Sequence, residues 1–338
     1  MKLYGGIDLH SNNQVVALLD EQDKVVYQRR LPNDLGVVLA ELMPYQSALE
    51  GLVVESTFNW YWLVDGLMEA GYRVHLANTA AIQQYQGLKH TDDPYDARWL
   101  AHLLRLGILP EGYIYPREER PLRDLARKRL QLVRQRTTQV LSIQNLVVRN
   151  TGSKPTGNRI KQWTESDVDE LLSHPDLALA VKSNLRVRCC LDEQLEVLEG
   201  RILEQAKLRG AFRPLLSVYG VGRILALTIM LEAGDMGRFE KVGNFASYAR
   251  CVDSKKLSNG KRKGSGNTKN GNKYLAWAFV EAANFAVRYY PQVKRYYQRK
   301  AAKTNGALAI KAVAHKLARA CYYVVRDQGQ FDVNKAFA

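Results

Sequence analysis

Short apolar runs separated by polar turns mark the N-terminal third of the chain. LYGGIDL, QVVALLD and KVVYQRRL predict three successive strands, with HSNNQ and EQDK as the turns between them. A helical stretch from Asp34, the apolar strand GLVVE, a helix over 60–70 and the strand YRVHLAN follow. Three strands followed by helix, strand, helix and strand predict a mixed α/β sheet of the ribonuclease-H type over residues 1–115.

Residues 116–210 have a helical pattern almost throughout. Heptad-like apolar spacing over 133–147 predicts a first long helix, and NTGSKPTGN predicts the break that ends it. A second helix carries an apolar seam with steps of four, three and four residues, the spacing of a coiled coil. The seam consists of Leu191, Leu195, Leu198 and Ile202. Two structures agree with it: a helical hairpin that packs on itself, and a contact between protomers of a homo-oligomer.

The third region, residues 211–330, is predicted to be mainly helical with one polar interruption. LLSVYGVGRILALTIMLEAG places a Gly-Val-Gly turn between apolar helices and resembles a helix-hairpin-helix element, whose glycines expose backbone N–H groups to a phosphate. Simple helix packing explains the same pattern. The segment DSKKLSNGKRKGSGNTKNGNK (253–273) has no apolar periodicity, so it predicts a loop that can approach a phosphate backbone closely.

The balance of charge narrows the choice of partner. The 338 residues include 49 Lys+Arg and 34 Asp+Glu, which gives a net charge of +15 and a pI near 9.6. Such a balance predicts a polyanionic partner, nucleic acid before any other. The expected nucleic-acid contacts are the basic residues of the polar segment: Lys255, Lys256, Lys261, Arg262, Lys263, Lys269 and Lys273. A basic membrane-surface protein is the alternative, but the sequence has no amphipathic anchor or lipidation signal.

The spacing of the cysteines and the polarity of the N-terminal residues predict the cellular compartment of the protein. Four cysteines show no CxxC spacing, which predicts neither a zinc site nor a disulfide framework. Polar residues interrupt the N-terminal apolar run before a signal-peptide core could form, and no apolar run is long enough to cross a bilayer. We therefore expect a reducing, cytoplasmic setting and no membrane partner.

Four acidic residues form a candidate metal site. Asp8 follows the apolar start of the first strand and Glu55 ends the fourth strand, and in a ribonuclease-H-type sheet these two strands lie side by side. Asp93 and Asp96 are three residues apart in a helix that Pro94 can begin, so both carboxylates lie on one face. Four carboxylates in one cluster are suitable ligands for Mg²⁺.

Each acid also has an ordinary explanation. Asp93 could cap a helix, Asp96 could be a surface residue, and Glu55 could form a salt bridge with a basic side chain. Asp92, next to Asp93, is expected to point away and to act as a cap. Only the combination of the four acids with the predicted fold and the charge favours a metal site.

The motifs GIDLH, VVEST and KHTDDPYDAR, together with FASYAR and SNGKRKGSGNTKNGNKYLAWAFVEAA, resemble those of a known family. The family is the DEDD transposases of insertion sequences, the IS-one-ten family, with its IS-eleven-eleven branch the most similar. These proteins are described as bridge-RNA-guided recombinases. The resemblance covers essentially the whole chain, and its C-terminal block is the most specific part.

The resemblance implies an N-terminal RuvC-like domain, a coiled-coil insertion used in assembly, and a C-terminal transposase domain with a nucleophilic serine. By motif, Asp8, Glu55, Asp93 and Asp96 take the DEDD positions and would hold Mg²⁺. Ser258 best matches the serine, with Ser254 and Ser265 as alternatives in the same segment. The family further implies a 5′-phosphoserine link to DNA, donor and target DNA as substrates, a non-coding bridge RNA as guide, and a dimer or tetramer.

Two other functions compete with this one. A Holliday-junction-type endonuclease would use only the acids and a metal-activated water, so Ser258 would be dispensable and no covalent adduct would form. A non-catalytic scaffold for DNA or RNA would bind without Mg²⁺ and would tolerate loss of the acids.

Overall fold

The chain forms two compact units, and one late segment of the chain belongs to the unit that contains the N-terminal residues. The computed structural model describes residues 1–82, 93–252, 255–265 and 270–337. One unit, here the N-unit, comprises residues 1–117 together with 254–270, and the other, the C-unit, comprises 118–253 and 271–338. The chain therefore passes between the units three times.

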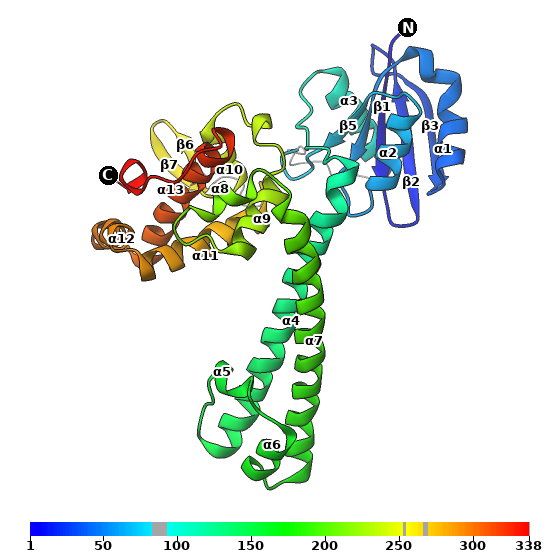
Figure 1. The fold of residues 1–338 in the computed structure, drawn as a ribbon. Helices are drawn as coiled ribbons and strands as arrows, with labels where there is room; N and C mark the ends of the chain where they lie inside the picture. Colours follow the sequence, from blue (N-terminus) through cyan, green and yellow to red (C-terminus); the bar gives the residue numbers. More distant parts are fainter. Residues whose placement is uncertain (83–92, 253–254, 266–269, 338) are drawn as a thin grey trace. The chain divides into compact units, whose positions relative to one another are not determined.

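A five-stranded mixed sheet forms the centre of the N-unit, in the order β3-β2-β1-β4-β5 (Figure 1). Its strands are β1 (Leu3–Leu9), β2 (Asn13–Leu19), β3 (Val25–Pro32), β4 (Leu49–Glu55) and β5 (Val74–Ala77). The β1–β2 and β2–β3 pairs are antiparallel, whereas β1–β4 and β4–β5 are parallel. All five predicted strands are present, and the first lies beside the fourth as predicted.

Helices cover both faces of this sheet. Apolar side chains of α1 (Leu35–Leu42) and α2 (Tyr61–Glu69) share a core with Ile7 and Leu9 of β1. The opposite face packs against α3 (Asp93–Arg105) through Ala97 and Leu100. Because successive strand residues face opposite sides, the side chain of Asp8 belongs to the face covered by α3.

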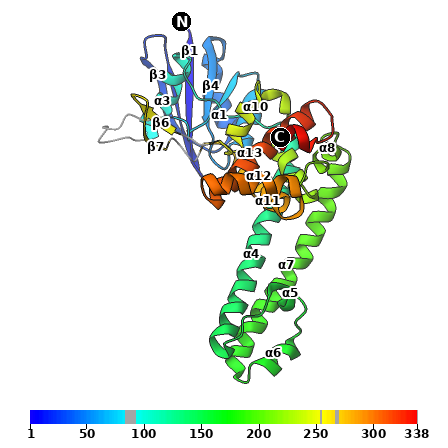
Figure 2. The same ribbon diagram turned by 90° about the vertical axis from the view of Figure 1, so that its left-hand side faces the viewer.

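Two long antiparallel helices form an arm of the C-unit, α4 (Arg120–Thr151) and α7 (Pro175–Lys207), and they run side by side in both views (Figures 1 and 2). Gly152 ends α4 in a left-handed conformation with φ of 72°, at the predicted break. The short helices α5 (Gly157–Ile160) and α6 (Glu165–Leu171) close the tip around a small core of their own.

The seam of α7 packs mainly within the chain. Leu195 and Ile202 are buried, whereas Leu191 and Leu198 are half-buried. Arg129 and Arg136 of α4 pair with Glu199 and Asp192 of α7, which adds charge pairs across the same interface. Of the two structures that the seam allowed, the described residues therefore show the helical hairpin.

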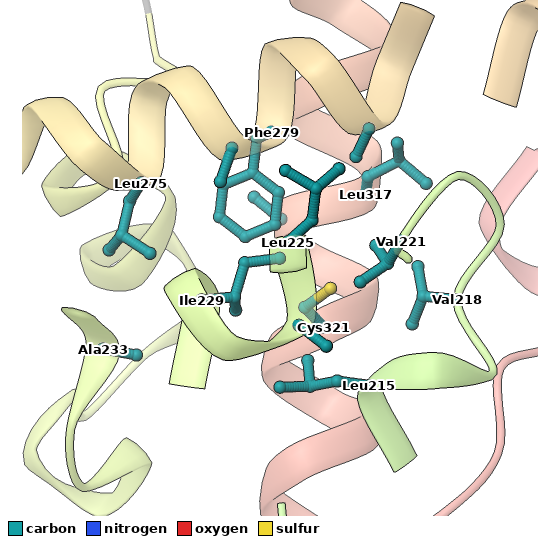
Figure 3. Close-up of a cluster of buried hydrophobic side chains, with 14 of the residues drawn as sticks. Leu215, Val218, Val221, Leu225, Ile229, Ala233, Leu275, Phe279, Leu317 and Cys321 are labelled. Carbon is teal, nitrogen blue, oxygen red and sulfur yellow. The ribbon is translucent and has the colours of Figure 1, made fainter. Parts of the chain in front are cut away.

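The remainder of the C-unit is a helical bundle around one apolar core. Its helices are α8 (Phe212–Leu216), α9 (Arg223–Ala233), α10 (Val242–Tyr248), α11 (Lys273–Tyr289), α12 (Pro291–Lys303), α13 (Gly306–Arg326) and α14 (Val333–Phe337). Figure 3 shows Leu225 and Ile229 of α9 facing Phe279 of α11 and Cys321 of α13. Elsewhere in the chain, short 3₁₀ helices occupy Met43–Ala48 and Arg117–Glu119, and a third occupies Met236–Arg238 before α10.

The Gly-Val-Gly turn between α8 and α9 has a packing role. Gly220 has φ of +82°, and a Cβ atom there would lie 2.1 Å from the backbone oxygen of Ala282 in α11. Gly222 faces open space instead. The first glycine is therefore required for close helix packing, which is the simpler of the two explanations of the Gly-Val-Gly pattern.

No helix among the described residues has both the length and the apolarity needed to cross a membrane.

The polar segment after α10 contains regular structure that the sequence analysis did not predict. Strands β6 (Lys255–Ser258) and β7 (Lys261–Ser265) form an antiparallel hairpin, with Ser258 paired to Lys261. The turn residues Asn259 and Gly260 both have positive φ, 49° and 70°. Asn-Gly is the strongest signal for such a two-residue turn, so the prediction of an irregular loop was wrong here for a reason visible in the sequence.

Candidate active site

Two of the four predicted acids lie on neighbouring strands. Ile7 of β1 is in register with Val54 of β4, which places Asp8 beside Glu55 at the same end of the sheet. Asp8 is buried, with 4% of its surface exposed, and Glu55 is half-buried. Both side chains lie on the face covered by α3, since they alternate with residues of the α1–α2 core. The strand pairing thus brings two carboxylates together.

Gly6 lets α3 approach this end of the sheet. A Cβ atom at Gly6 would lie 2.0 Å from the backbone oxygen of Ala97 and 2.8 Å from the backbone nitrogen of Ala101. No side chain fits at those distances, so the glycine fixes how closely the helix packs on β1. The first turn of the same helix carries Asp93 and Asp96. The close packing therefore brings the second pair of acids to the first.

The other end of α3 is held by the turn between β2 and β3. Asp23 adopts a left-handed conformation there, with φ of 63°. Its Oδ1 lies 2.9 Å from the Nδ1 of His102 and accepts a hydrogen bond of 2.7 Å from the Nε of Arg105. Burial works against ionisation of Asp23, but its hydrogen bonds to Arg105 and His102 outweigh it and lower its pKa. The helix is thus anchored at both ends.

Asp8, Glu55 and Asp96 line one cavity of about 410 Å³, together with Thr79, Ile82, Trp99 and Leu100. Burial raises the pKa of the Glu55 carboxyl to about 8, and a hydrogen bond with Asp8 and the charges of Asp8 and Asp96 act in the same direction. The carboxyl keeps its proton near neutral pH because it is withdrawn from water beside two other carboxylates. Such a site favours a bound cation.

Asp93 lies in a second group that shares Asp8. Its Oδ2 is 3.2 Å from the Nε2 of His10 and 2.5 Å from the Nη2 of Arg30, and the same Nε2 is 3.3 Å from the Oδ2 of Asp8. One ligand atom each of Asp8, His10 and Asp93 lie within 4.8 Å of one another. The hydrogen bond from Arg30 and the nearby His10 lower the pKa of Asp93.

His10 and Arg30 were missed by the sequence analysis. His10 stands two residues after Asp8, directly after the last residue of β1, so the GIDLH motif contained it. Arg30 lies on β3, which is two strands away from β1 in the sheet order. Nothing local in the sequence relates Arg30 to Asp93.

The donors present fit a divalent metal ion. Asp8, Glu55 and Asp96 supply carboxylate oxygens to one cavity, and Asp93 stands at the adjoining group with Asp8. Hard cations such as Mg²⁺ prefer carboxylate oxygens. The structural observation that supports this fit is the convergence of three carboxylates on one cavity, and the raised pKa of Glu55 agrees with it, because binding of a cation there would replace a proton.

Ser258 stands at the end of β6, directly before the Asn-Gly turn, and is exposed. Lys261 and Lys263 on β7 and Lys273 at the start of α11 are exposed too. Lys255, Lys256 and Arg262 lie on the hairpin strands, whereas Lys269 and the alternative serine Ser254 lie outside the described residues. The turn geometry thus places Ser258 at the tip of one hairpin, opposite the β7 residues Lys261, Arg262 and Lys263.

The segment that contains the hairpin belongs to the N-unit, the unit that carries the acids. At the end of this segment the Nδ2 of Asn78, just after β5, donates a hydrogen bond of 3.3 Å to the Oδ1 of Asn270. These two residues are 192 positions apart in the chain.

A buried charge network anchors the chain where it leaves this segment. The Oδ1 of Asn272 caps α11 by accepting from the backbone N–H groups of Tyr274 and Leu275, and its Nδ2 donates to Glu232 at 2.7 Å. Arg123 and Arg127 of α4 also bind the Glu232 carboxylate. Burial opposes the ionisation of Glu232, but the hydrogen bond from Arg127 and the two charges outweigh it and lower its pKa. Sequence reasoning did not find this network, because its members lie on three separate helices.

Comparison with known proteins gives three matches. Residues 5–150 match a family model described as "Transposase", for the DEDD type of IS110. Residues 213–298 match the model described as "Transposase IS116/IS110/IS902 family". A protein of Sinorhizobium fredii named "Putative transposase y4qE" is 24% identical over 266 residues, which cover 77% of this chain. The matched part is 65% of that relative's length.

Proposed function

Because the chain belongs to the IS110 family of transposases, we propose that it cuts and rejoins DNA with Ser258 as nucleophile and Asp8, Glu55, Asp93 and Asp96 as ligands of Mg²⁺. The observation that carries the proposal is the convergence of Asp8, Glu55 and Asp96 on one cavity, with a Glu55 carboxyl of raised pKa. The remaining support comes from the position of Ser258 and from the charge of the chain.

The proposed reaction is an exchange of phosphodiester bonds. The Oγ of Ser258 attacks the phosphorus of a DNA strand, an Oγ–P bond forms, and the bond from phosphorus to the 3′ oxygen breaks. The serine loses its hydroxyl proton and the departing 3′ oxygen gains one, so a 5′-phosphoserine and a free 3′ hydroxyl remain. Attack by the 3′ hydroxyl of another strand reverses these changes and releases the serine. Bond types balance across both steps, so no external energy source is needed.

The acids have a defined part in this scheme. When bound, the metal ion would compensate the charge that accumulates on the phosphate oxygens and favour ionisation of the attacking hydroxyl. The chain's own contribution is to hold the ligands: strand pairing fixes Asp8 and Glu55, and the close packing of α3 on Gly6 fixes Asp93 and Asp96. Arg30 and His10 hold the Asp93 carboxylate in place through direct contacts.

The hairpin supports the choice of Ser258. A serine at the end of a tight two-residue turn is exposed while its backbone stays in a fixed strand pairing. The neighbouring Lys261 and Lys263 are exposed and place positive charge where the phosphates would lie. Ser265 stands at the far end of β7, paired with Lys255.

The proposed partners follow from the family resemblance and the charge. Donor and target DNA are the expected substrates, and a non-coding bridge RNA that pairs with both is the expected source of sequence specificity. A net charge of +15 is compatible with binding to several nucleic-acid strands at once. We further propose that protomers assemble as a homo-oligomer, with the α4–α7 arm as the assembly element.

A covalent adduct is the decisive test. Labelled DNA carrying the insertion-sequence ends and target is incubated with the protein, the bridge RNA and Mg²⁺, and the products are separated by denaturing electrophoresis. We expect a protein–DNA adduct that Ser258→Ala removes and that Ser265→Ala, the matched variant in the same hairpin, retains. An adduct that depends on Ser265 instead would change the residue assigned. Cleavage that is unaffected by Ser258→Ala and forms no adduct would favour a metal-dependent endonuclease of the Holliday-junction type.

A further inference from the structure

The last helices of the C-unit carry an unusual run of positive charge. Between Glu281 and Asp327 the chain has no acidic residue, yet it has ten basic ones. They are Arg288, Lys294, Arg295, Arg299, Lys300, Lys303, Lys311, Lys316, Arg319 and Arg326. Five of them lie on α12, a helix of 13 residues. This density of one sign of charge costs self-repulsion unless a polyanion offsets it.

The five basic residues of α12 are all exposed, and no carboxylate within the described residues forms an ion pair with any of them. Within the described residues the next ion pair along the chain is Arg326 with Asp327, at the C-terminal end of α13. Some other exposed arginines of the chain are paired, for example Arg186 with Glu165 and Arg201 with Glu204. Exposed bases elsewhere, such as Arg134 and Arg149, also lack an ion pair in the part of the chain that the structure describes, so the distinguishing feature of α12 is its density of five unpaired bases in 13 residues.

A packed inner face holds α12 in place and turns its charges outward. Val293 is fully buried, and the ring of Tyr296 packs edge-on against Phe337 of α14 at 5.5 Å. Lys316 of α13 lies over the Tyr296 ring at 5.0 Å and donates to the backbone oxygen of Ala336 at 2.6 Å. Tyr296 is thus used for packing. The exposed cations stand on a fixed helix.

The charges are also close together in space. Burial lowers the pKa of Lys316, and Arg319, Lys300 and Arg299 lower it further. Burial likewise lowers the pKa of His315, and the charges of Arg319 and Lys316 add to this effect. Groups from α12 and α13 thus share one positive field.

A groove of about 520 Å³ between α12 and α14 gives this surface a shape. Arg295 and Arg299 line it at positions i and i+4, with the amides of Gln292, Gln298 and Asn334 beside them. Every polar side chain in this lining can donate hydrogen bonds, and no acid is among them. Guanidinium groups bind phosphate oxygens through paired hydrogen bonds, and residues one turn apart are spaced about 5–6 Å, which suits two phosphates of one strand.

We propose that the α12–α14 groove binds the sugar–phosphate backbone of duplex DNA through Arg295 and Arg299. This contact surface consists of residues other than those of the Ser258 hairpin and the acid cluster, and it reads no base sequence. The choice of DNA as the polyanion rests on the proposed function. The effect of the groove is to add affinity and to position a duplex against the C-unit.

The test measures equilibrium binding without chemistry. Fluorescence anisotropy gives the affinity of the full chain for a labelled random duplex of about 30 base pairs, in EDTA, across a range of salt concentrations. The variant is Arg295→Gln with Arg299→Gln. Its matched control is Arg186→Gln with Arg201→Gln, which removes two charges that are already paired. Both replacements keep a long side chain with good helix propensity at exposed positions.

We expect the Arg295/Arg299 variant to make the slope of log affinity against log salt less negative by about 1.8, since each lost phosphate contact reduces the magnitude of the slope by about 0.9. Between 50 and 200 mM salt, the affinity of the variant should therefore fall about tenfold less than the affinity of the wild type. An unchanged slope, or an equal change in the control, would overturn the proposal. Loss of binding to a duplex RNA of equal length with DNA binding intact would overturn the choice of DNA. None of these results depends on Ser258, so they are distinct from failure of the adduct test.

Discussion

Replacement of Glu55 by glutamine tests the electrostatics of the acid cluster directly. The pKa of Glu55 rises from an ordinary value of 4.5 to about 8, so the folded protein keeps a proton on this carboxyl that the unfolded chain has lost. Without metal, the contribution of this group to stability is fully present below pH 4.5. It is lost as pH rises from 4.5 to 8, because ionisation favours the unfolded chain throughout that window. Glutamine has the shape of the protonated carboxyl and cannot ionise.

The size of the effect follows from the pKa. One pKa unit corresponds to about 1.4 kcal/mol, so the full rise would cost at most about 5 kcal/mol above pH 8. Glu55 is only half-buried, and solvent screening reduces this to an expected cost of about 1–2 kcal/mol. We therefore expect Glu55→Gln to stabilise the metal-free protein by about that amount at pH 8.5, and hardly at all at pH 5.

Urea unfolding in EDTA at pH 5, 7 and 8.5 measures this difference, and hydrogen exchange of β1 and β4 peptides confines it to the N-unit. Addition of Mg²⁺ should reverse the order at pH 8.5. The ion stabilises the wild type by binding its folded state, whereas the neutral amide of the variant is a weaker ligand than the carboxylate it replaces. A variant that is less stable than the wild type at pH 8.5 in EDTA, or a difference that does not vary with pH, would refute the reasoning.

Three further predictions concern residues that support the site or the arm. Gly6→Ala should displace α3 and weaken Mg²⁺ binding measured by calorimetry by at least about tenfold, whereas Gly200→Ala, at an open helical position, should not; equal affinities would show that α3 does not need the close approach. Glu232→Gln should leave its arginine partners without a counter-charge and lower the free energy of unfolding of the C-unit by about 3 kcal/mol. Unfolding is monitored by the fluorescence of Trp277 in α11, and an unchanged free energy of unfolding would contradict a buried ion pair. Leu195→Asp should reduce arm helicity measured by circular dichroism, since this side chain is buried in the hairpin; normal helicity with a smaller particle mass in light scattering would restore the protomer contact.

The sequence predicted the sheet well because its signals are local. Each strand of the N-unit is an apolar run between polar turns, and the strand order that follows from this pattern already brought Asp8 next to Glu55. The helical start at Asp93–Pro94 was likewise a local signal. By contrast, the hairpin that presents Ser258 has strands without apolar periodicity, and only the Asn259-Gly260 dipeptide signals its turn, so a prediction from periodicity gives a loop there.

The remaining parts of the site depend on contacts between distant segments. Gly6 has no special backbone angle, and its importance appears only when α3 is packed on the sheet. Arg30 and Glu232 resemble many other charged residues in the sequence, and their partners are fixed by tertiary structure alone. The assignment of Ser258 and of the metal ligands stays a prediction that the adduct and calorimetry experiments test.

The three passages of the chain between the two units have a consequence for synthesis on the ribosome. The sheet and α3, which carry the acids, are complete once residue 117 has emerged, but the segment 254–270 that belongs to the same unit follows only after the whole arm. At usual rates of translation this interval lasts roughly 8 to 30 s. A nascent chain can therefore fold its carboxylate cluster well before it contains the hairpin of Ser258, and it acquires the proposed nucleophile only when most of the protein already exists.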